Sequence, residues 1–346
     1  MAFLAAALLV HHFGAWAYVA TKRAVPVDVL LDRWDANIYS EIARHGYSGD
    51  LFAFLPLYPL CVRGLAWALN LLSTPQYVGA ALSTLLLLLF ILISERTPTG
   101  EAALTPRTVW GWAVFLFSPA SYVFHSHHTE SLFVVLSFVS LYWASTDRPL
   151  KAGLASALCI LTRNQGFLVA LAVGLFILRR SKPGDRLRRL ALASVPIALS
   201  VCGLLLFEWL AGGDALAFVH AQRQWSHADS LHSVLATFWF GNPWQYPDLY
   251  SWLSLVFFLS LGVATVPLIR RCPPLGVYAA LSLIIQLGQG ELVHAFRYGA
   301  VLFPILFLAG DWLSRLPRSL RWTAFACLVL LNHNVTLRYA LGRWAY

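Results

Sequence analysis

The first residues that could do chemistry lie in a polar segment at positions 33–47, with the sequence RWDANIYSEIARHGY. Asp35 follows a tryptophan and precedes a helix-like pattern in which Ile38 and Ile42 share one face. A carboxylate beside low-dielectric lipid can act as a general base, because desolvation and neighbouring charges tune its pKa. The alternative is that Asp35 only caps the helix, since an aspartate at that position satisfies free backbone N–H groups.

Two further candidate segments are HSHHTE at 125–130 and TRNQG at 162–166. Glu130 could position a substrate hydroxyl, bind a metal with the nearby histidines, or merely complement the dipole of the helix that it begins. Because the histidines lack the helical spacing of zinc motifs, no metal site is predicted. Arg163 stands among apolar residues, where a charge is costly and marks a function or a fixed ion-pair partner, for which Glu130 is a candidate. Its planar guanidinium would also suit a phosphate ligand.

The C-terminal half contributes one more arginine and an aromatic segment. Arg297, in AFRYG at the mouth of an apolar stretch, could bind phosphate or only extend its charge toward the membrane surface. Residues 212–249 contain Gln222 and several tryptophans. These indoles suit the aromatic belt of a membrane protein and stacking on sugar rings equally well, so both interpretations stay open.

The elements that position these residues must be membrane helices. The residues AVILMFWYC make up 59% of the 346 positions and charged residues only 12%, whereas soluble domains average about 25% charged residues. So few charges cannot cover a water-facing surface. We therefore predict an all-α polytopic membrane protein with about ten or eleven transmembrane helices, in one membrane-embedded domain over residues 1–346. The apolar stretches lie at 2–20, 76–94, 108–123, 130–146, 150–178, 190–211, 250–269, 274–289, 298–313 and 322–340.

Basic loops predict the orientation of these helices. Loops at 94–107, 147–151, 179–189, 270–271 and 315–321 are expected in the cytoplasm. All five can lie there if 150–178 is a tight hairpin that turns near 162–166 and residues 53–72 make no net crossing; an ordinary span at 53–72 is the alternative. Residues 21–72 then form an outer loop with interfacial helices, and 212–249 a second large outer loop. The polar clusters at 32–50, 125–130, 162–165, 220–248 and 291–297 then share the non-cytoplasmic face.

Several function classes are disfavoured by the same patterns. The net charge of +9 gathers in loops such as 179–189, as the positive-inside rule requires, so no nucleic-acid partner is predicted. Five scattered cysteines indicate neither a disulfide framework nor a metal site. No nucleotide-binding loop is present. The alternative to an enzyme is a transporter or a flippase of lipid-linked sugars. Such a protein is expected to show inverted repeats and charged residues near the middle of the membrane. Here the ionisable residues gather at one face, which favours an enzyme that acts at the membrane surface.

The order of the motifs adds a resemblance to a known family. The segments RWDANIYSEIARHGY, FLPLYPL, FSPASYVFHSHHTESLF, LTRNQG, HAQRQW and FRYGAVLFPILFL resemble the PIG-V family of GPI mannosyltransferase II and its bacterial relatives, in the glycosyltransferase C superfamily. The resemblance implies a GT-C fold and transfer of a hexose, typically mannose, from a polyprenyl- or dolichyl-phosphate carrier to a lipid or glycan acceptor. The histidines at 125–128 and Gln165 depart from the family pattern and leave the acceptor open.

The resemblance also implies roles for individual residues. Asp35 matches the essential aspartate of the first outer loop and would be the general base, while Arg163 and Arg297 would bind the donor phosphate. Residues that would bind substrate or support the site are Arg33, Trp34, Asn37, Tyr39, Glu130, Asn164, Gln222 and Tyr298. No cofactor is expected, and a divalent metal requirement is left open. Arginine outnumbers lysine 22 to 3, which favours a bacterial source. For a bacterial protein we expect an inner-membrane location, with the active site on the outer face that the basic loops and the resemblance indicate.

Overall fold

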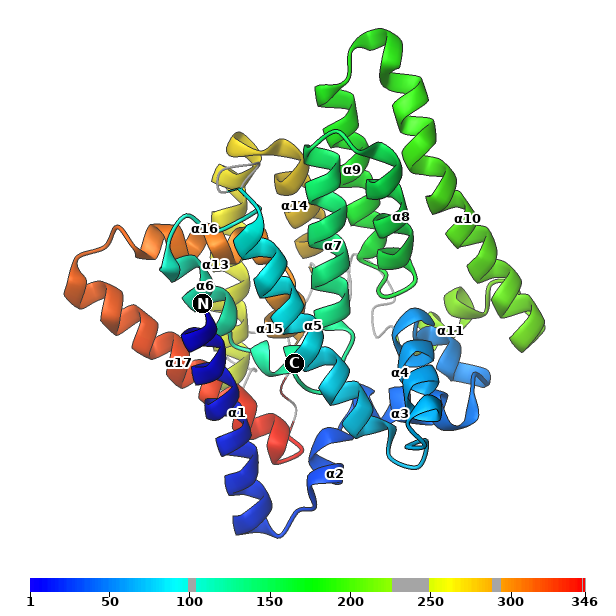
Figure 1. The fold of residues 1–346 in the computed structure, drawn as a ribbon. Coiled ribbons are helices and arrows are strands. Elements are labelled where there is room, and N and C mark those ends of the chain that lie inside the picture. Colours follow the sequence, from blue (N-terminus) through cyan, green and yellow to red (C-terminus); the bar gives the residue numbers. More distant parts are fainter. Residues whose placement is uncertain (99–103, 226–248, 288–293, 344, 346) are drawn as a thin grey trace, which may run out of the picture. The chain divides into compact units, whose positions relative to one another are not determined.

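The computed structural model describes residues 1–98, 104–225, 249–287, 294–343 and 345. Within these residues the chain forms sixteen α-helices, three short 3-10 helices and no β-strand (Figure 1). The predicted all-α fold and its polytopic membrane character are confirmed. The predicted cluster at 220–248 lies mostly outside the described residues, which include only 220–225 of it; of the cluster at 291–297 the structure describes 294–297.

Four helices are long and apolar enough to cross a membrane: α1 (Ala2–Arg23), α5 (Pro75–Arg96), α10 (Arg186–Gly212) and α13 (Leu249–Arg271). The 22 residues of α1 extend about 33 Å at about 1.5 Å per residue, which matches a hydrocarbon core of about 30 Å. Shorter apolar helices accompany them, namely α7 (Glu130–Ser145), α8 (Pro149–Ile160), α14 (Pro273–Leu287) and α16 (Phe303–Leu313). The number of ten or eleven crossings stays a prediction.

Two of the apolar stretches expected to be single helices are interrupted. The stretch at 298–313 is divided between α15 (Ala295–Ala300) and α16. Pro304 lies in the first turn of α16, and its ring would clash with the carbonyl of Ala300 if α15 continued. The stretch at 108–123 contains only the eight residues of α6 (Val109–Leu116) before the 3-10 turn η2 (Ser121–Phe124). Pro119, between α6 and η2, cannot continue a helix either.

The chain divides into two compact units. Unit 1 contains Met1–Val25, Thr97–Tyr122 and Ser226–Tyr346, and unit 2 contains Pro26–Arg96 and Val123–Trp225. The prediction of a single domain over residues 1–346 is untested by this division. The functional residues predicted from the sequence are distributed over both units, with Arg297 and Tyr298 in unit 1 and the others in unit 2.

The centre of unit 2 is a bundle of α7, α8, α9 (Gly166–Arg180) and α10. The predicted hairpin at 150–178 is confirmed, because α8 and α9 pack together and residues 161–165 form the turn between them. Gly153 of α8 lies against α10, where an added Cβ would be 2.2 Å from the carbonyl oxygen of Ala193. Small residues allow such close helix packing in membranes. A different side of α8 is exposed and apolar, with Leu150, Leu154 and Leu158 at intervals of four residues.

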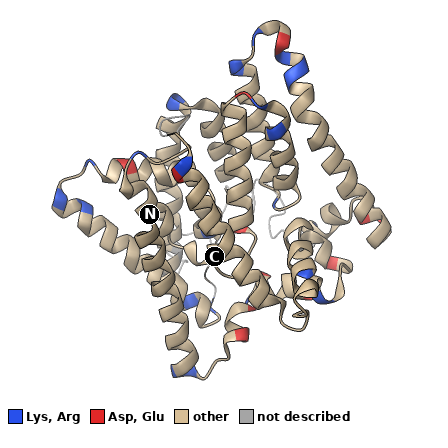
Figure 2. Cartoon of the chain, in the orientation of Figure 1, with Lys and Arg blue, Asp and Glu red and all other residues tan. Residues whose placement is uncertain are grey.

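The two ends of this bundle differ. At one end Arg189 of α10 pairs with Asp147 in the α7–α8 turn, and the arginine-rich α9–α10 connection lies there too (Figure 2). Short helices lie at the other end: α3 (Asp35–His45), α4 (Leu57–Ala68) and α11 (Ala217–Trp225) (Figure 1). The 12 residues of α4 reach about 18 Å, so α4 could cross a hydrocarbon core of about 30 Å only where the lipid is locally thinned. This length agrees with the prediction that residues 53–72 make no net crossing.

Unit 1 is built around packed helices that include α1, α6, α16 and α17 (Arg318–Ala340). Asn332 of α17 is completely buried; its Oδ1 lies 2.7 Å from Nε2 of His12, and its Nδ2 donates to the carbonyl oxygen of Ser118 at 2.7 Å. Asp311 of α16 accepts hydrogen bonds from the backbone N–H groups of Arg107 and Thr108, both at 3.0 Å. This carboxylate therefore satisfies donors at the beginning of α6.

Candidate functional site

Asp35 is the first residue of α3 and is partly buried. The N-cap position is taken by Trp34, which makes no side-chain cap hydrogen bond. Asp35 therefore occupies the first helical position rather than the N-cap, and its catalytic role stays a prediction beside a structural role at this helix end. A carboxylate in the first helical turn still lies where the helix dipole favours negative charge.

Trp34 holds the backbone before Asp35 in an unusual conformation. Its φ is 55° and its ψ is −127°, and the N–H of Ala36 donates to the carbonyl oxygen of Arg33 at 3.1 Å. These values match the second residue of a type II′ turn, a position that glycine normally occupies. A residue with a Cβ in such a region costs on the order of 1–3 kcal/mol, and such strain persists only where the surroundings impose it.

One face of α3 is held by Asp32, which directly follows α2 (Val27–Leu31). The Asp32 carboxylate accepts a hydrogen bond from Ser40, a second from Nδ2 of Asn37 at 3.3 Å, and lies 3.9 Å from the guanidinium of Arg44. Arg44 in turn donates to Oε1 of Gln76 on α5 at 3.2 Å. Asn37, Ser40 and Arg44 share this face by helical spacing. The two carboxylates of the segment thus differ, because Asp32 is engaged in orienting α3.

Asp35 lies on the opposite face, which also carries Tyr39 one turn further on. The Tyr39 ring is buried, and its centroid is 5.3 Å from that of Tyr58, 5.6 Å from that of Phe54 and 5.8 Å from that of His127. These aromatic rings meet edge to face, the arrangement that aromatic pairs favour. Tyr39 was predicted to support the site, and the structure makes it part of the packing under the helix of Asp35.

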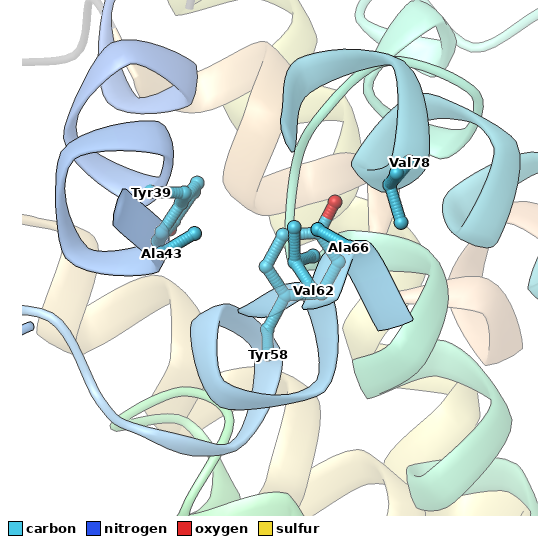
Figure 3. Close-up of a cluster of buried hydrophobic side chains, with 6 residues drawn as sticks. All are labelled: Tyr39, Ala43, Tyr58, Val62, Ala66 and Val78. Atoms are coloured by element: carbon cyan, nitrogen blue, oxygen red, sulfur yellow. The ribbon is translucent and has the colours of Figure 1, made fainter. Parts of the chain in front are cut away.

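The apolar part of this packing joins α3, α4 and α5. Its buried members are Tyr39, Ala43, Tyr58, Val62, Ala66 and Val78 (Figure 3). Arg63 of α4 donates to the carbonyl oxygens of Ala43 and Arg44, at 3.0 and 3.3 Å, near the C-terminal end of α3. Both ends of α3 are therefore tied to neighbouring elements, so that the position of its first residue follows from the packing of the whole helix.

Glu130 and Arg163 meet in the same unit. Arg163 Nη1 lies 2.5 Å from Oε1 of Glu130 and donates to Oγ1 of Thr129 at 2.8 Å, and both charged side chains are buried. The ion pair considered from the sequence is confirmed. A guanidinium with five N–H donors can hold a carboxylate and a further acceptor at once, so the role of Arg163 as a phosphate ligand stays a prediction.

The turn that carries Arg163 is fixed from two directions. The N–H of Leu57, at the start of α4, donates to the carbonyl oxygen of Leu161 at 2.9 Å. Gly166 begins α9 so close to α8 that an added Cβ would lie 2.4 Å from the backbone of Ile160. Asn164, between these contacts, is half-buried. The FLPLYPL segment therefore connects the surroundings of α3 to the turn of Arg163.

Other predicted residues lie around this end of unit 2. Arg33 is half-buried, and its Nε has no hydrogen-bond partner among the described residues. Trp34 and Asn37 are exposed. Gln222 of α11 donates from Nε2 to the carbonyl oxygen of Ala53 at 2.7 Å, so it holds α11 against η1 (Gly49–Ala53). Nearby, burial raises the pKa of Tyr47, whose hydroxyl therefore stays protonated and donates to a backbone carbonyl.

Arg297 and Tyr298 belong to unit 1. Arg297 is buried in α15, and the ring centroid of Tyr298 lies 5.9 Å from that of His294, edge to face. A second arginine of unit 1, Arg338 of α17, places its guanidinium carbon 4.2 Å from the ring centroid of Tyr250. The roles predicted for Arg297 and Tyr298 stay predictions.

Sequence reasoning missed Tyr58 and His127 as a pair. The Tyr58 hydroxyl lies 3.0 Å from Nδ1 of His127, 3.0 Å from Oγ of Ser83 and 3.1 Å from the carbonyl oxygen of Gly79. Both side chains are completely buried. Tyr58 in the apolar segment FLPLYPL and His127 in the polar segment HSHHTE were the available signals, but nothing local indicates that they are partners. Among the described residues, no group of three or more histidine, cysteine or acidic side chains could hold a metal ion.

Long apolar helices and a polar site at one end of a helix bundle define the chain as a polytopic membrane protein. Residues 20–179 match the family described as Mannosyltransferase (PIG-V). The resemblance to the PIG-V family that the motifs predicted is therefore confirmed over the part of the chain that holds Asp35, Glu130 and Arg163.

Curated relatives agree with this match. GPI mannosyltransferase 2 of Drosophila pseudoobscura pseudoobscura is 30% identical over 162 residues, which cover 43% of this chain and 36% of the relative. GPI alpha-1,6-mannosyltransferase 2 of Rattus norvegicus is 31% identical over 176 residues, which cover 46% of this chain and 35% of the relative. The chain thus spans about a third of the length of the curated relatives it matches. No solved structure matches it.

Proposed function

We propose that the chain is an integral membrane mannosyltransferase of the GT-C type. It moves mannose from a polyprenyl- or dolichyl-phosphate-linked donor to a lipid or glycan acceptor on the non-cytoplasmic face, and Asp35 is the general base. The relatives described above are mannosyltransferases, which supports mannose as the transferred sugar. A bacterial inner membrane is the expected location.

The observation that carries the proposal is the placement of the polar residues in unit 2. The helix of Asp35 and the Glu130–Arg163 pair lie at one end of the bundle, and the arginine-rich connections lie at the opposite end. Since arginine-rich loops stay in the cytoplasm, the end with Asp35 faces the other side. A lipid-linked donor brings its sugar and phosphate to this membrane surface, where a soluble nucleotide sugar is not needed.

The proposed chemistry is a single displacement. Asp35 takes the proton of the acceptor hydroxyl while the hydroxyl oxygen attacks the anomeric carbon of mannose. The bond from that carbon to the lipid phosphate breaks, the phosphate leaves with the electron pair, and the configuration inverts. Arg163 stabilises the negative charge that grows on the phosphate, and the resemblance implies the same role for Arg297. In this scheme Glu130 and Thr129 orient the Arg163 guanidinium through the contacts at 2.5 and 2.8 Å.

The test is mannose transfer in membranes that contain the wild type or Asp35→Asn. Radiolabelled polyprenyl-phosphate-mannose serves as donor, and a crude lipid and glycan extract as acceptor. We expect Asp35→Asn to lower transfer by on the order of 10²–10⁴-fold, the usual contribution of a general base. Glu41→Gln is the matched control, because Glu41 is an exposed carboxylate on the same helix.

The outcomes separate the parts of the proposal. Transfer by the wild type and by Glu41→Gln, but not by Asp35→Asn, supports both the reaction and the base. Equal transfer by all three eliminates Asp35 as the base. No transfer by any of them contradicts the lipid-phosphate donor and favours a transporter of lipid-linked sugars, which flux measurements in vesicles would detect.

A further inference from the structure

His127 occupies a position that an apolar side chain could fill at less energetic cost. It is completely buried, and its Nε2 has no hydrogen-bond partner among the described residues. Burying a polar group without full hydrogen bonding is unfavourable, so such a group needs an explanation in terms of the rest of the structure. Within the described part of the chain, the ring is hydrogen-bonded through Nδ1 to the Tyr58 hydroxyl at 3.0 Å.

The backbone of α5 is shaped to admit this ring. An added Cβ on Gly79 would lie 1.7 Å from Nδ1 of His127, which is far inside van der Waals contact. The carbonyl oxygen of the same glycine accepts from Tyr58 at 3.1 Å, and Ser83 of α5 donates to the carbonyl oxygen of His128 at 2.9 Å. The glycine, the tyrosine and the imidazole therefore fit together as one arrangement across α4, α5 and the segment before α7.

This arrangement supports the helix of Asp35 through Tyr39. The Tyr39 ring packs on both members of the hydrogen-bonded pair, 5.3 Å from Tyr58 and 5.8 Å from His127 between centroids. Tyr39 follows Asp35 by four residues, so the two lie one above the other on the same face of α3. A helical side chain covers the turn that precedes its own Cα, which for Tyr39 is the turn of Asp35.

We propose that His127 is a positioning residue for the transfer reaction, and that its hydrogen bond to Tyr58 fixes Tyr39 and thereby the first turn of α3, where Asp35 lies. The inference rests on the proposed function in its reference to Asp35 as the base. His127 touches neither substrate in this role. It acts by restricting α3, and a displacement of the base by about 1 Å can lower a rate by about 10²-fold.

The first test compares kinetics of His127→Ala and His127→Asn. An asparagine amide can occupy the place of Nδ1 and keep the bond to Tyr58, whereas alanine cannot. We expect His127→Ala to lower kcat by about 10- to 100-fold with KM for the lipid-linked donor unchanged, and His127→Asn to recover most of the rate. His45→Ala, at an exposed position on α3, is the control. A loss of rate that is the same in Ala and Asn variants contradicts the role of the hydrogen bond.

The second test uses the contact with Gly79. Gly79→Ala should displace the imidazole and lower kcat as His127→Ala does. In the double variant Gly79→Ala/His127→Ala the added methyl group no longer meets a ring, so the double variant should be no worse than His127→Ala alone. Additive losses in the double variant would contradict the proposed arrangement, because contacting residues are expected to be non-additive.

A third measurement does not depend on activity. Hydrogen exchange of peptides from 35–45, measured by mass spectrometry on detergent-solubilised protein, reports the opening of α3. We expect faster exchange there in His127→Ala, restored protection in His127→Asn, and unchanged exchange in α9. Unchanged exchange over 35–45 overturns the positioning role whatever the activity. Absence of mannose transfer by the wild type would instead overturn the proposed function, so the two failures are distinguishable.

Discussion

Glu130 and Arg163 form a buried ion pair at 2.5 Å, between the first residue of α7 and the turn that joins α8 to α9. Neither side chain has ready access to water, since Glu130 is fully buried and Arg163 is 9% exposed. The pair therefore links the beginning of α7 to the α8–α9 turn. It also holds in place the guanidinium that the proposed reaction requires.

Breaking this pair should destabilise the protein strongly. Glu130→Ala leaves a buried guanidinium without its carboxylate, and the expected loss is about 3–5 kcal/mol. Glu130→Ala/Arg163→Met should be more stable than Glu130→Ala, because no charge is left uncompensated. Thermal unfolding in detergent measures both. The interpretation is wrong if the double variant loses the sum of the two single losses.

Trp34 should reveal stored backbone strain. Its φ of 55° and ψ of −127° suit glycine, so Trp34→Gly should be more stable than Trp34→Ala by about 1 kcal/mol. The two variants lose the same indole, and their difference therefore reports the backbone alone. The measurement is the difference in unfolding temperature, and equal stabilities would show that the turn relaxes without the tryptophan.

Close packing of α8 on α10 predicts opposite effects for two glycines. Gly153→Ala should lower stability, because its Cβ would be 2.2 Å from the backbone oxygen of Ala193. Gly174→Ala, in α9, meets no atom within 4 Å and should be neutral or stabilising by up to about 1 kcal/mol through helix propensity. The pair is compared by thermal unfolding in the same detergent. A larger loss at Gly174 would contradict the described packing.

Acid should destabilise the fold partly through His127. Burial lowers the pKa of this histidine to about 3, and His128 and Arg44 add to the effect, whereas its ordinary value is 6.5. Between these values the unfolded chain binds a proton at His127 that the folded chain does not. The free energy of unfolding is therefore highest above pH 6.5, and it decreases as the pH falls toward 3. The slope is at most about 1.4 kcal/mol per pH unit.

The comparison that isolates this effect is His127→Asn, which cannot titrate in this range. The groups that face or act on this imidazole are Tyr39, Tyr58, His128 and Arg44, and all of them are the same in the variant. Unfolding temperatures measured from pH 7 to pH 4 should therefore decline less steeply in the variant than in the wild type. Parallel curves would show that His127 is not the titrating group.

The sequence patterns predicted helices and turns well, but they did not predict contacts between residues that are far apart in the sequence. The basic loops on both sides of 150–178 and the TRNQG cluster predicted the α8–α9 hairpin. The cost of a charge in lipid predicted a partner for Arg163. The breaks before α16 and after α6 were missed because apolar composition hides the effect of a proline. Tyr58 and His127 are 69 positions apart, and only the packing of α3, α4 and α5 brings them together. The glycine-like backbone of Trp34 has no sequence signal at all.

The exposed leucines of α8 set a condition on the surrounding lipid. Leu150, Leu154 and Leu158 present an apolar stripe on a helix of 12 residues, which is about 18 Å long against a hydrocarbon layer of about 30 Å. A membrane helix this short is accommodated by local thinning of the lipid, by flanking side chains that reach the interface, or by association with other helices. Where the lipid thins, head groups come closer to the turn of Arg163 at the end of α8. A phosphate on a lipid chain would then reach a buried arginine without leaving the head-group layer, so that membrane thickness itself becomes a variable of the reaction.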